Sequence, residues 1–306
     1  MSHFFAFGEV LWDVYPTEKY IGGAPFNFAT HLSYLNANAY LISAVGNDEL
    51  GEQTVKSVKA NGISTDFLSH NDYMTGECTV TLEGAIPKYD LKTNTAYDNI
   101  VLTDEMKEML KGYTDKSLYF GTLAMRSSVS GNTLRELVTD YEWKNIYYDI
   151  NIRKPNYSKE NILFGLKSCT VFKFSREEAP IFNELELTSV KKDDFSLQTE
   201  YFKSLCTDLV QKYNIEDVVM TLDKDGAAVY NKSTDKFVLS EKSDVKDVST
   251  VGAGDSFFAT FSYFKDKNED VADCINKAVL VSGYVCTKTE SAPQYTDELK
   301  RKIGLI

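Results

Sequence analysis

The chain has 306 residues, of which 43% are hydrophobic and 25% are charged, and these values predict one large α/β domain, or one domain with a small appendage. Its formal net charge of −12 at pH 7 argues against nucleic acid or an anionic membrane as the main partner. An anionic ligand would therefore need a local positive site.

Five cysteines are scattered through apolar segments without a C-x-x-C pair, so we expect reduced core thiols in a cytoplasmic protein. The three histidines lack the spacing of metal ligands, and no protein metal site is predicted. No uncharged apolar run approaches the roughly 18 residues of a membrane helix. The first residues carry no basic region and become charged at Glu9, which favours a first strand over a signal peptide.

Residues 4–11 form the first predicted strand, and Asp13 follows it. A carboxylate just past the end of a strand stands where ligands of open α/β sheets bind. An Asp at such a place is more often a turn former, so the residue alone leaves both interpretations open.

Gly22 and Gly23 precede a predicted helix with an apolar stripe over residues 28–35. Adjacent glycines allow a backbone to approach a ligand closely. Asn27 lies in the same first turns and is either a ligand contact or a solvated side chain. Residues 39–45 are the next predicted strand, and residues 62–65 begin the one after it.

The pattern changes after residue 75. Residues 78–83 alternate apolar and polar side chains, and a second such run follows at residues 88–91. Alternation is typical of strands with one buried face, so these strands predict a small sheet separate from the main one. We expect it to comprise about residues 13–21 and 72–100.

Beyond residue 100, strand and helix patterns alternate, which predicts parallel βα units. The expected strands are 117–121, 146–150, 169–174 and 217–222, and the expected helices are 130–141, 200–213 and 270–287. Arg153 follows one of these strands in a polar segment that could equally be an ordinary loop. Without a linker or repeat, residues 1–306 are predicted to form a single domain with the small sheet attached.

The most informative stretch begins at residues 248–251, three of which are β-branched, and this predicts a strand. It turns through Gly252, Ala253 and Gly254 and continues as a helix from Asp255. Backbone N–H groups converging at a helix N-terminus are a plausible anion cradle. A carboxylate beside such a cradle could take a proton during phosphoryl transfer, although an Asp at a helix start is more often a simple cap.

This stretch, V-G-A-G-D-S-F at residues 251–257, resembles the C-terminal signature D-T-x-G-A-G-D-[SA]-F of the PfkB-type (ribokinase-like) sugar kinases. The segment I-G-G-A-P-F-N-F-A at residues 21–29 resembles the family's first signature, and D-I-N-I-R at residues 149–153 resembles its D-x-N-x-R-P. Residues 8–16 and 96–100 resemble the fructokinase branch, the latter with Tyr in place of Trp. The resemblance runs nearly from end to end, with the motifs in the family's order.

The resemblance implies a doubly wound, mainly parallel α/β fold with a small β lid. It implies transfer of the γ-phosphoryl group of ATP to a sugar primary hydroxyl, with Mg²⁺ neutralising the phosphates. Asp255 would act as the base, while the N–H groups of Gly252, Ala253 and Gly254 would stabilise the transferring phosphoryl group. Other residues are implied in sugar binding (Asp13, Gly22, Gly23, Asn27 and Arg153) or in the nucleotide and magnesium–phosphate contacts (Thr221, Gly226 and Glu178).

The fructokinase-like segments favour phosphorylation of D-fructose to fructose 6-phosphate. Ribose, 2-keto-3-deoxygluconate and nucleosides are alternative substrates within the family, and a catalytically silent sugar-binding regulatory protein is an alternative of another class. The small sheet needs a partner surface for its apolar face. We therefore expect a homodimer in which Val80 and Leu82 contact the second subunit.

Three positions depart from the family pattern. Ser175 replaces the Asn of N-x-x-E, and Asp223 replaces the first Gly of T-L-G-x-x-G. Ser249 stands where the family has the Asp of D-T-x-G-A-G-D, which in many relatives helps to hold a monovalent cation, and Asp247 lies two residues upstream. Because a Ser hydroxyl is neutral, weak or absent potassium dependence is predicted.

Overall fold

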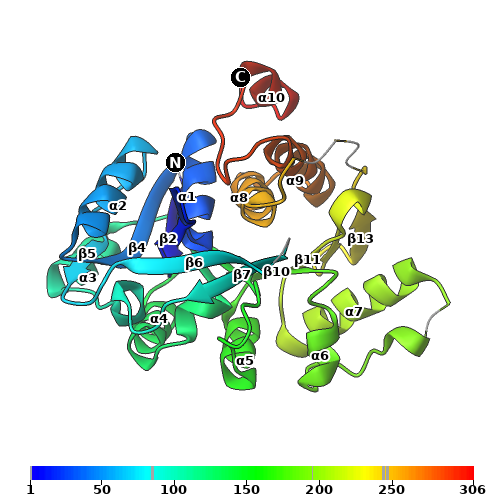
Figure 1. Ribbon diagram of the computed structural model, residues 1–306. Coiled ribbons are helices and arrows are strands. Elements are labelled where there is room, and N and C mark those ends of the chain that lie inside the picture. The colour runs from blue at the N-terminus through cyan, green and yellow to red at the C-terminus, as the bar shows by residue number, and fades with distance from the viewer. Residues whose placement is uncertain (1, 84–85, 195, 243–244, 246–247) are drawn as a thin grey trace. The chain divides into compact units, whose positions relative to one another are not determined.

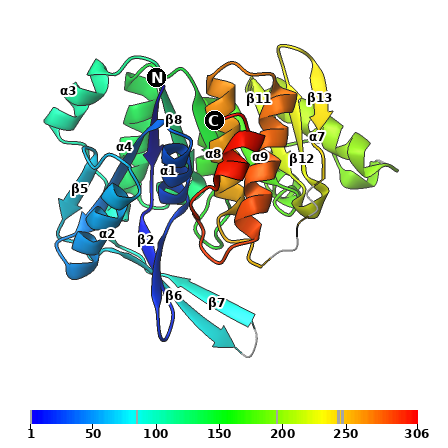
Figure 2. The same ribbon diagram turned by 90° about the horizontal axis from the view of Figure 1, so that it is seen from above.

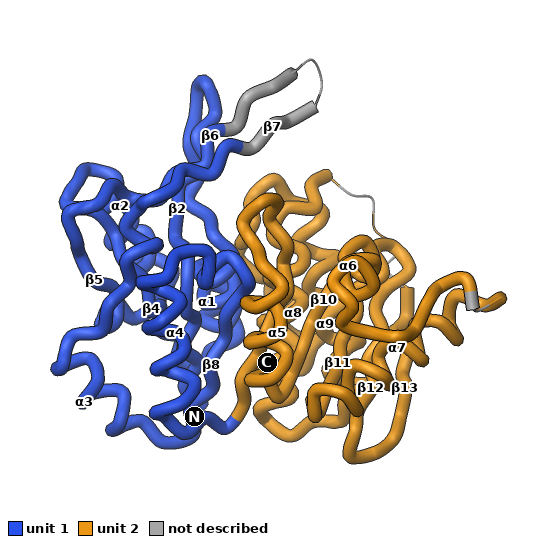
Figure 3. The backbone as a smooth tube through the Cα atoms, turned by 90° about the horizontal axis from the view of Figure 1, so that it is seen from below, with its two compact units in different colours: residues 1–144 blue, residues 145–306 orange. Residues whose placement is uncertain are grey.

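The computed structural model describes residues 2–83, 86–194, 196–242, 245 and 248–306, and it gives only the backbone of residues 80–83, 86–89 and 194. The chain divides into two compact units, Met1–Lys144 and Asn145–Ile306, which Figure 3 shows in different colours. Among the described residues, no helix is both long enough and apolar enough to cross a membrane.

The first unit is built on four parallel strands in the order β5-β4-β1-β8. Their bounds are β1 (His3–Phe7), β4 (Asn38–Gly46), β5 (Leu68–Asn71) and β8 (Lys116–Gly121). Figure 1 labels two of them, β4 and β5. Residues 4–7 are apolar and almost fully buried, as parallel strands covered on both faces require. Phe5 pairs in register with Tyr40 and Leu118 on the two neighbouring strands, and its ring stacks on that of Tyr40 with centroids 4.5 Å apart.

Helices α1 (Ala24–Tyr34), α2 (Glu49–Ala60) and α3 (Asp104–Gly112) lie between these strands along the chain, as does the short 3-10 helix η1 (Ala96–Asn99). The 3-10 helix η2 (Thr122–Met125) and helix α4 (Ser128–Asp140) follow β8. The side chains of Asp48, Thr103 and Ser127 accept backbone N–H groups in the first turns of α2, α3 and α4. Such caps satisfy donors that have no partner within the helix. Helix α1 begins instead after Gly23, which gives no side-chain cap.

A separate four-stranded sheet in the first unit has the order β3-β2-β6-β7. Its strands are β2 (Leu11–Val14), β3 (Lys19–Gly22), β6 (Gly76–Glu83) and β7 (Ile86–Leu91), with β2 parallel to β6 and the other pairs antiparallel. Figure 2 shows β6 and β7 side by side. The predicted small sheet is thus confirmed, although its strands end at Leu91 and residues 96–99 form η1. Val80 and Leu82, the predicted dimer contacts, lie outside the residues whose side chains are described.

The second unit carries three parallel strands, β9 (Ile146–Asp149), β10 (Val171–Ser175) and β11 (Asp217–Thr221), followed by antiparallel β12 (Ala227–Asn231) and β13 (Lys236–Leu239). Its helices are α5 (Lys159–Ser168), α6 (Pro180–Glu184), α7 (Gln198–Tyr213), α8 (Ala253–Asp266), α9 (Val271–Cys286) and α10 (Asp297–Lys302), with the short 3-10 helices η3 (Lys192–Asp194) and η4 (Asp223–Asp225). Helix α8 packs against α9, and both α7 and α9 contact β12.

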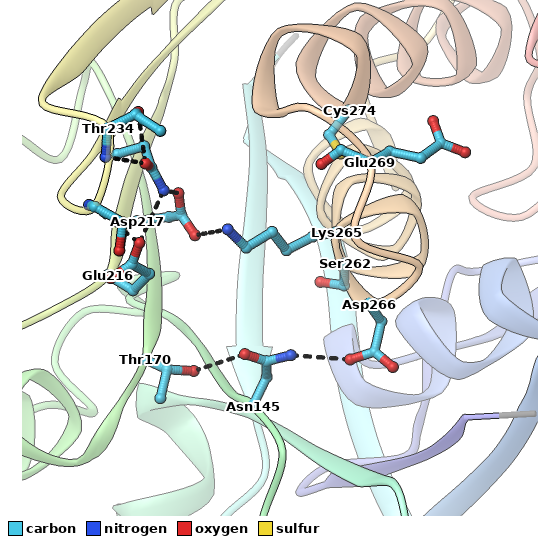
Figure 4. A network of polar contacts seen from close by, with 12 residues as sticks. Asn145, Thr170, Glu216, Asp217, Thr234, Ser262, Lys265, Asp266, Glu269 and Cys274 are labelled. Atoms are coloured by element: carbon cyan, nitrogen blue, oxygen red, sulfur yellow. Dashed lines mark hydrogen bonds and ion pairs between the residues drawn. The ribbon is translucent and has the colours of Figure 1, made fainter.

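The C-terminal end of α8 is tied to the strands by buried polar contacts (Figure 4). The Lys265 ammonium lies 2.8 Å from a carboxylate oxygen of Asp217, which is fully buried at the start of β11. The Asn145 amide, just before β9, donates to Asp266 at 2.9 Å. Asp217 and Asp266 are buried, so these contacts satisfy two buried carboxylates while holding the C-terminal end of α8.

The prediction of one strand over residues 4–11 is wrong. The structure divides this segment into β1 and β2, which belong to different sheets. Gly8 stands between them with φ of 136°, a conformation that is readily available only to glycine. The prediction missed this break because apolar residues, 4–7 and 10–11, stand on both sides of it.

The prediction of a strand over residues 248–251 is also wrong. The N–H groups of Val248 and Ser249 both donate to the carbonyl of Cys286, and the Ser249 hydroxyl accepts the N–H of Val251. The segment therefore turns beside the end of α9. The β-branched residues here are not buried strand residues, since the side chains of Val248 and Val251 are exposed. Asp247, which was weighed as a cation ligand, lies outside the described residues.

Candidate active site

The predicted anion cradle lies at the start of α8. Gly252 precedes the helix with φ of 79° and ψ of −5°, and a Cβ atom there would lie 2.1 Å from the carbonyl oxygen of Ser291. Only glycine fits this position. The Ala253 N–H already donates to the carbonyl of Thr250, whereas the N–H of Gly254 stands in the first turn, where helices have no internal acceptor.

A buried lysine lies against this turn. A Cβ atom on Gly254 would be 3.3 Å from the ammonium nitrogen of Lys173. Lys173 belongs to β10 and is paired in register with Asp149 of β9, and its ammonium lies 2.8 and 3.0 Å from the two carboxylate oxygens. Both side chains are at most 7% exposed. The start of α8 therefore sits beside a buried ion pair that the sequence analysis missed.

The carboxylates near Lys173 shift its pKa, and the same charged neighbours shift the pKa of Asp149. Burial raises the pKa of Asp149 to about 6, with Lys173 opposing the shift and Glu178 and Asp255 adding to it. Burial alone would lower the pKa of Lys173, but the carboxylates of Asp149, Glu178 and Asp255 outweigh it and raise the pKa. Lys173 is thus a cation at neutral pH, held among three acidic side chains of the second unit.

Glu178 joins two loops of the second unit. One of its carboxylate oxygens accepts the Ile152 N–H at 2.7 Å, and the other accepts the Ser175 N–H at 2.8 Å. It therefore fixes the segment after β9 to the turn after β10. Arg153, one residue beyond Ile152, is exposed, so its guanidinium can meet a ligand from solution.

The predicted nucleotide residues Thr221 and Gly226 flank a turn that a second missed residue holds. The Arg176 guanidinium donates to Asp223 at 2.8 Å and to Asp225 at 3.0 Å. The N–H of Arg176 also donates to the carbonyl of Thr221. Gly226 has φ of 90°, and a Cβ atom there would lie 2.4 Å from the Ser240 hydroxyl. Asp223, which departs from the family's Gly, thus has an ion-pair role.

The predicted sugar-binding residues of the first unit lie close together. Asp13 and Gly22 are on the paired strands β2 and β3, and a Cβ atom on Gly22 would be 3.0 Å from a carboxylate oxygen of Asp13. Gly23 has φ of 108°, and its added Cβ would lie 2.5 Å from the carbonyl of Glu9. Asn27 is buried one turn into α1, and its N–H donates to the Gly23 carbonyl.

Two further contacts hold this group in place. A Glu9 carboxylate oxygen accepts the N–H of Ala24 at 3.2 Å, so a buried acid supplies the cap at the start of α1. The Trp12 indole N–H donates to the Thr54 hydroxyl at 2.9 Å, which ties β2 to α2. Glu9 lies 15 residues before Ala24 in the sequence. No local capping motif could therefore have indicated its role.

Comparison with known proteins identifies the family of the chain. The model of the pfkB family carbohydrate kinases matches residues 2–297. The chain is similar to the ATP-dependent 6-phosphofructokinase of Thermoanaerobacterium thermosaccharolyticum, with 27% identity over 302 residues that cover 90% of this chain and 85% of that protein. It is also similar to the ribokinase of Dictyostelium discoideum, with 24% identity over 285 residues that cover 90% of this chain and 86% of that one.

Among solved structures, the fructokinase of Vibrio cholerae O395 in a form with bound fructose, ADP and calcium aligns with a TM-score of 0.75 over 96% of both chains, at 19% identity. At that identity the likeness concerns the fold alone. Fold and family match together define a carbohydrate kinase with a doubly wound, mainly parallel α/β fold and a small extra sheet. The chain belongs to the PfkB family, and it is a phosphotransferase with an alcohol group as acceptor.

Proposed function

We propose that this kinase transfers the γ-phosphoryl group of ATP to a primary hydroxyl of a sugar, with D-fructose as the first candidate. The proposal rests on the start of α8. There the backbone adopts a conformation that needs glycine at residue 252, and the turn with Asp255 lies beside the buried ammonium of Lys173. The fructokinase-like segments at residues 8–16 and 96–100 support fructose. Because the relatives include a ribokinase and a 6-phosphofructokinase, the choice of sugar is the part that experiment must decide.

In the proposed reaction the sugar hydroxyl oxygen bonds to the γ-phosphorus while the bond from that phosphorus to the bridging oxygen of ADP breaks. Asp255 takes the proton of the hydroxyl. The N–H of Gly254 and its neighbours in the first turn stabilise charge on the transferring group, since a helix N-terminus favours anions. The Ala253 N–H could join them once it leaves its present acceptor, the carbonyl of Thr250.

The remaining predicted residues have supporting roles in this proposal. Asp13 accepts hydrogen bonds from sugar hydroxyls, and the buried Asn27 and Gly22–Gly23 shape the same surface. Arg153 meets the sugar or the transferring phosphoryl group, and Thr221 and Gly226 contact the nucleotide. We further propose a cytoplasmic enzyme of one kinase domain, with residues of about 13–21 and 72–100 as the lid and a homodimer formed through it.

The proposal includes Mg²⁺. This ion generally keeps several waters and binds phosphates with one or two carboxylates, and the acidic surroundings of the start of α8 fit that demand. When bound, it would neutralise part of the phosphate charge. Glu178 is the residue proposed for the magnesium–phosphate network; its two carboxylate oxygens already fix the loops after β9 and β10, so its part is to keep those loops in position.

The experiment is ADP release measured across D-fructose, ribose, 2-keto-3-deoxygluconate, a nucleoside and fructose 6-phosphate. Asp255→Asn should lower kcat on the best substrate by roughly two to four orders of magnitude, the usual worth of a general base, with sugar binding nearly intact. Asp273 also lies in the first turn of a helix, α9, so Asp273→Asn is the matched control and should keep kcat. An Asp255→Asn enzyme with more than about a tenth of the wild-type kcat would show that Asp255 is not the base.

A further inference from the structure

A charged lysine is energetically unfavourable at the position of Lys173. It is 5% exposed in a central strand of the second unit, where lysine is rarely found unless it is paired. Its ammonium also lies against the first turn of α8, and the positive end of a helix disfavours a neighbouring cation. A buried ion pair contributes little to stability compared with apolar residues of the same volume. Packing alone therefore gives no reason for a cation here.

The surroundings of Lys173 show what its charge faces. Asp149 holds the ammonium from β9 at 2.8 and 3.0 Å. Glu178, from the turn after β10, and Asp255, from α8, also interact with it electrostatically. One cation thus stands among three carboxylates, and one of these is the proposed base. An arriving phosphoryl group would add further negative charge at this turn.

We propose that Lys173 is a positioning residue for phosphoryl transfer: anchored by Asp149, its buried ammonium supports the turn Gly252–Asp255 and keeps the Asp255 carboxylate ionised as the phosphate charge arrives. The inference rests on the proposed function. Its physical basis is Coulombic, because an opposite charge in a poorly solvated site favours the ionised form of a carboxylate. Lys173 does not take up a proton or a phosphoryl group in this scheme.

The test replaces the whole ion pair. In Lys173→Met/Asp149→Asn both charges are removed together, which avoids leaving an uncompensated buried charge. The matched control is Lys265→Met/Asp217→Asn, which removes the ion pair between Lys265, 20% exposed, and the buried Asp217 at the other end of the same helix (Figure 4). The readouts are the thermal midpoint, kcat, KM for the sugar, and the pH profile of kcat/KM.

The Lys173 double variant should fold and keep its KM for the sugar within about threefold, while kcat falls at least tenfold. The acid limb of its pH profile should move to higher pH, but by less than the roughly 1–3 units that losing an opposite charge alone gives, because the like charge of Asp149 is removed with it. The control should change the thermal midpoint but neither kcat nor the acid limb. A Lys173 double variant with unchanged kcat and an unmoved acid limb overturns the inference.

Asp149→Asn alone gives a second test that leaves Lys173 in place. This variant removes a like charge near Asp255 and leaves the ammonium, so the acid limb should move to lower pH, opposite to the double variant. An upward shift, or none, overturns the inference. Failure of the wild-type protein to phosphorylate any sugar of the panel would contradict the proposed function. An active wild-type protein whose Lys173 and Asp149 variants keep the wild-type kcat and acid limb would contradict only the role of Lys173.

Discussion

Replacing Gly252 by Ala should disable the site without touching any side chain that carries charge. The new Cβ would lie 2.1 Å from the Ser291 carbonyl oxygen, far below the 3.0 Å that such contacts essentially never undercut, so the turn or the Ser291 segment must move by about 1 Å. The left-handed conformation costs a non-glycine residue roughly 1–2 kcal/mol, and overpacking costs about 1–3 kcal/mol. The free energy of unfolding should therefore fall by about 2–5 kcal/mol.

Catalysis should suffer more than stability. A misplacement of about 1 Å at a catalytic turn costs on the order of a hundredfold, so Gly252→Ala should lower kcat about 100-fold in the ADP-release assay, with the KM for the sugar little changed. Gly131→Ala is the matched control, because a Cβ there meets nothing closer than 3.6 Å within helix α4; it should be neutral or stabilising by up to about 1 kcal/mol. If Gly252→Ala kept both the wild-type thermal midpoint and a kcat within threefold of wild type, the steric reasoning would be refuted.

Three other outcomes are expected. Asp13→Ala should raise the KM for the sugar by about 5- to 150-fold, the equivalent of roughly 1–3 kcal/mol for unpaired hydroxyls, and an effect confined to ATP would contradict its role. Burial opposes the ionisation of Asp48, but hydrogen bonds from Thr75 and Gly51 prevail and lower its pKa; its contribution to stability is therefore present above pH about 4 and lost as the pH falls through the lowered pKa. Asp48→Asn should accordingly destabilise the protein at pH 7 by about 1–3 kcal/mol and by less at pH 3, as urea unfolding would show, and an equal loss at both pH values would contradict this. Because Ser249 offers no carboxylate and its hydroxyl accepts the Val251 N–H, kcat/KM in potassium, sodium and a bulky organic cation should agree within about tenfold, or 1.4 kcal/mol; a larger potassium activation would show that a cation site persists.

The sequence predicted what depends on local chemistry. Gly252 and Gly254 indicated a tight turn before a helix, and the turn is where it was expected, because glycine placement reports backbone conformation directly. The role of Lys173 could not be predicted, because it depends on a contact between residues distant in the sequence. Its strand pattern indicates burial, but its partner Asp149 lies 24 residues away on the neighbouring strand, and only the register of two strands brings them together.

The misplaced strands have a similar cause. Residues 4–7 and 10–11 are apolar, and hydrophobicity alone does not distinguish one long buried strand from two strands in different sheets. Between the two strands, Gly8 has a positive φ, and the sequence alone does not show which conformation a glycine adopts. The antiparallel strands β12 and β13 were missed because their pairing, β12 with β11 and β13 with β12, is a property of the assembled sheet.

The contact between Trp12 and Thr54 gives the first unit a built-in optical reporter. The chain has only two tryptophans, and Trp12 directly precedes Asp13 on β2, with its indole N–H bound to Thr54 and the Lys19 ammonium 5.5 Å from its ring centroid. Indole emission responds to the loss of such a bond and to a nearby charge. In a Trp143→Phe background, all tryptophan fluorescence would arise beside the proposed sugar carboxylate, so that sugars could be ranked by titration without nucleotide and without turnover.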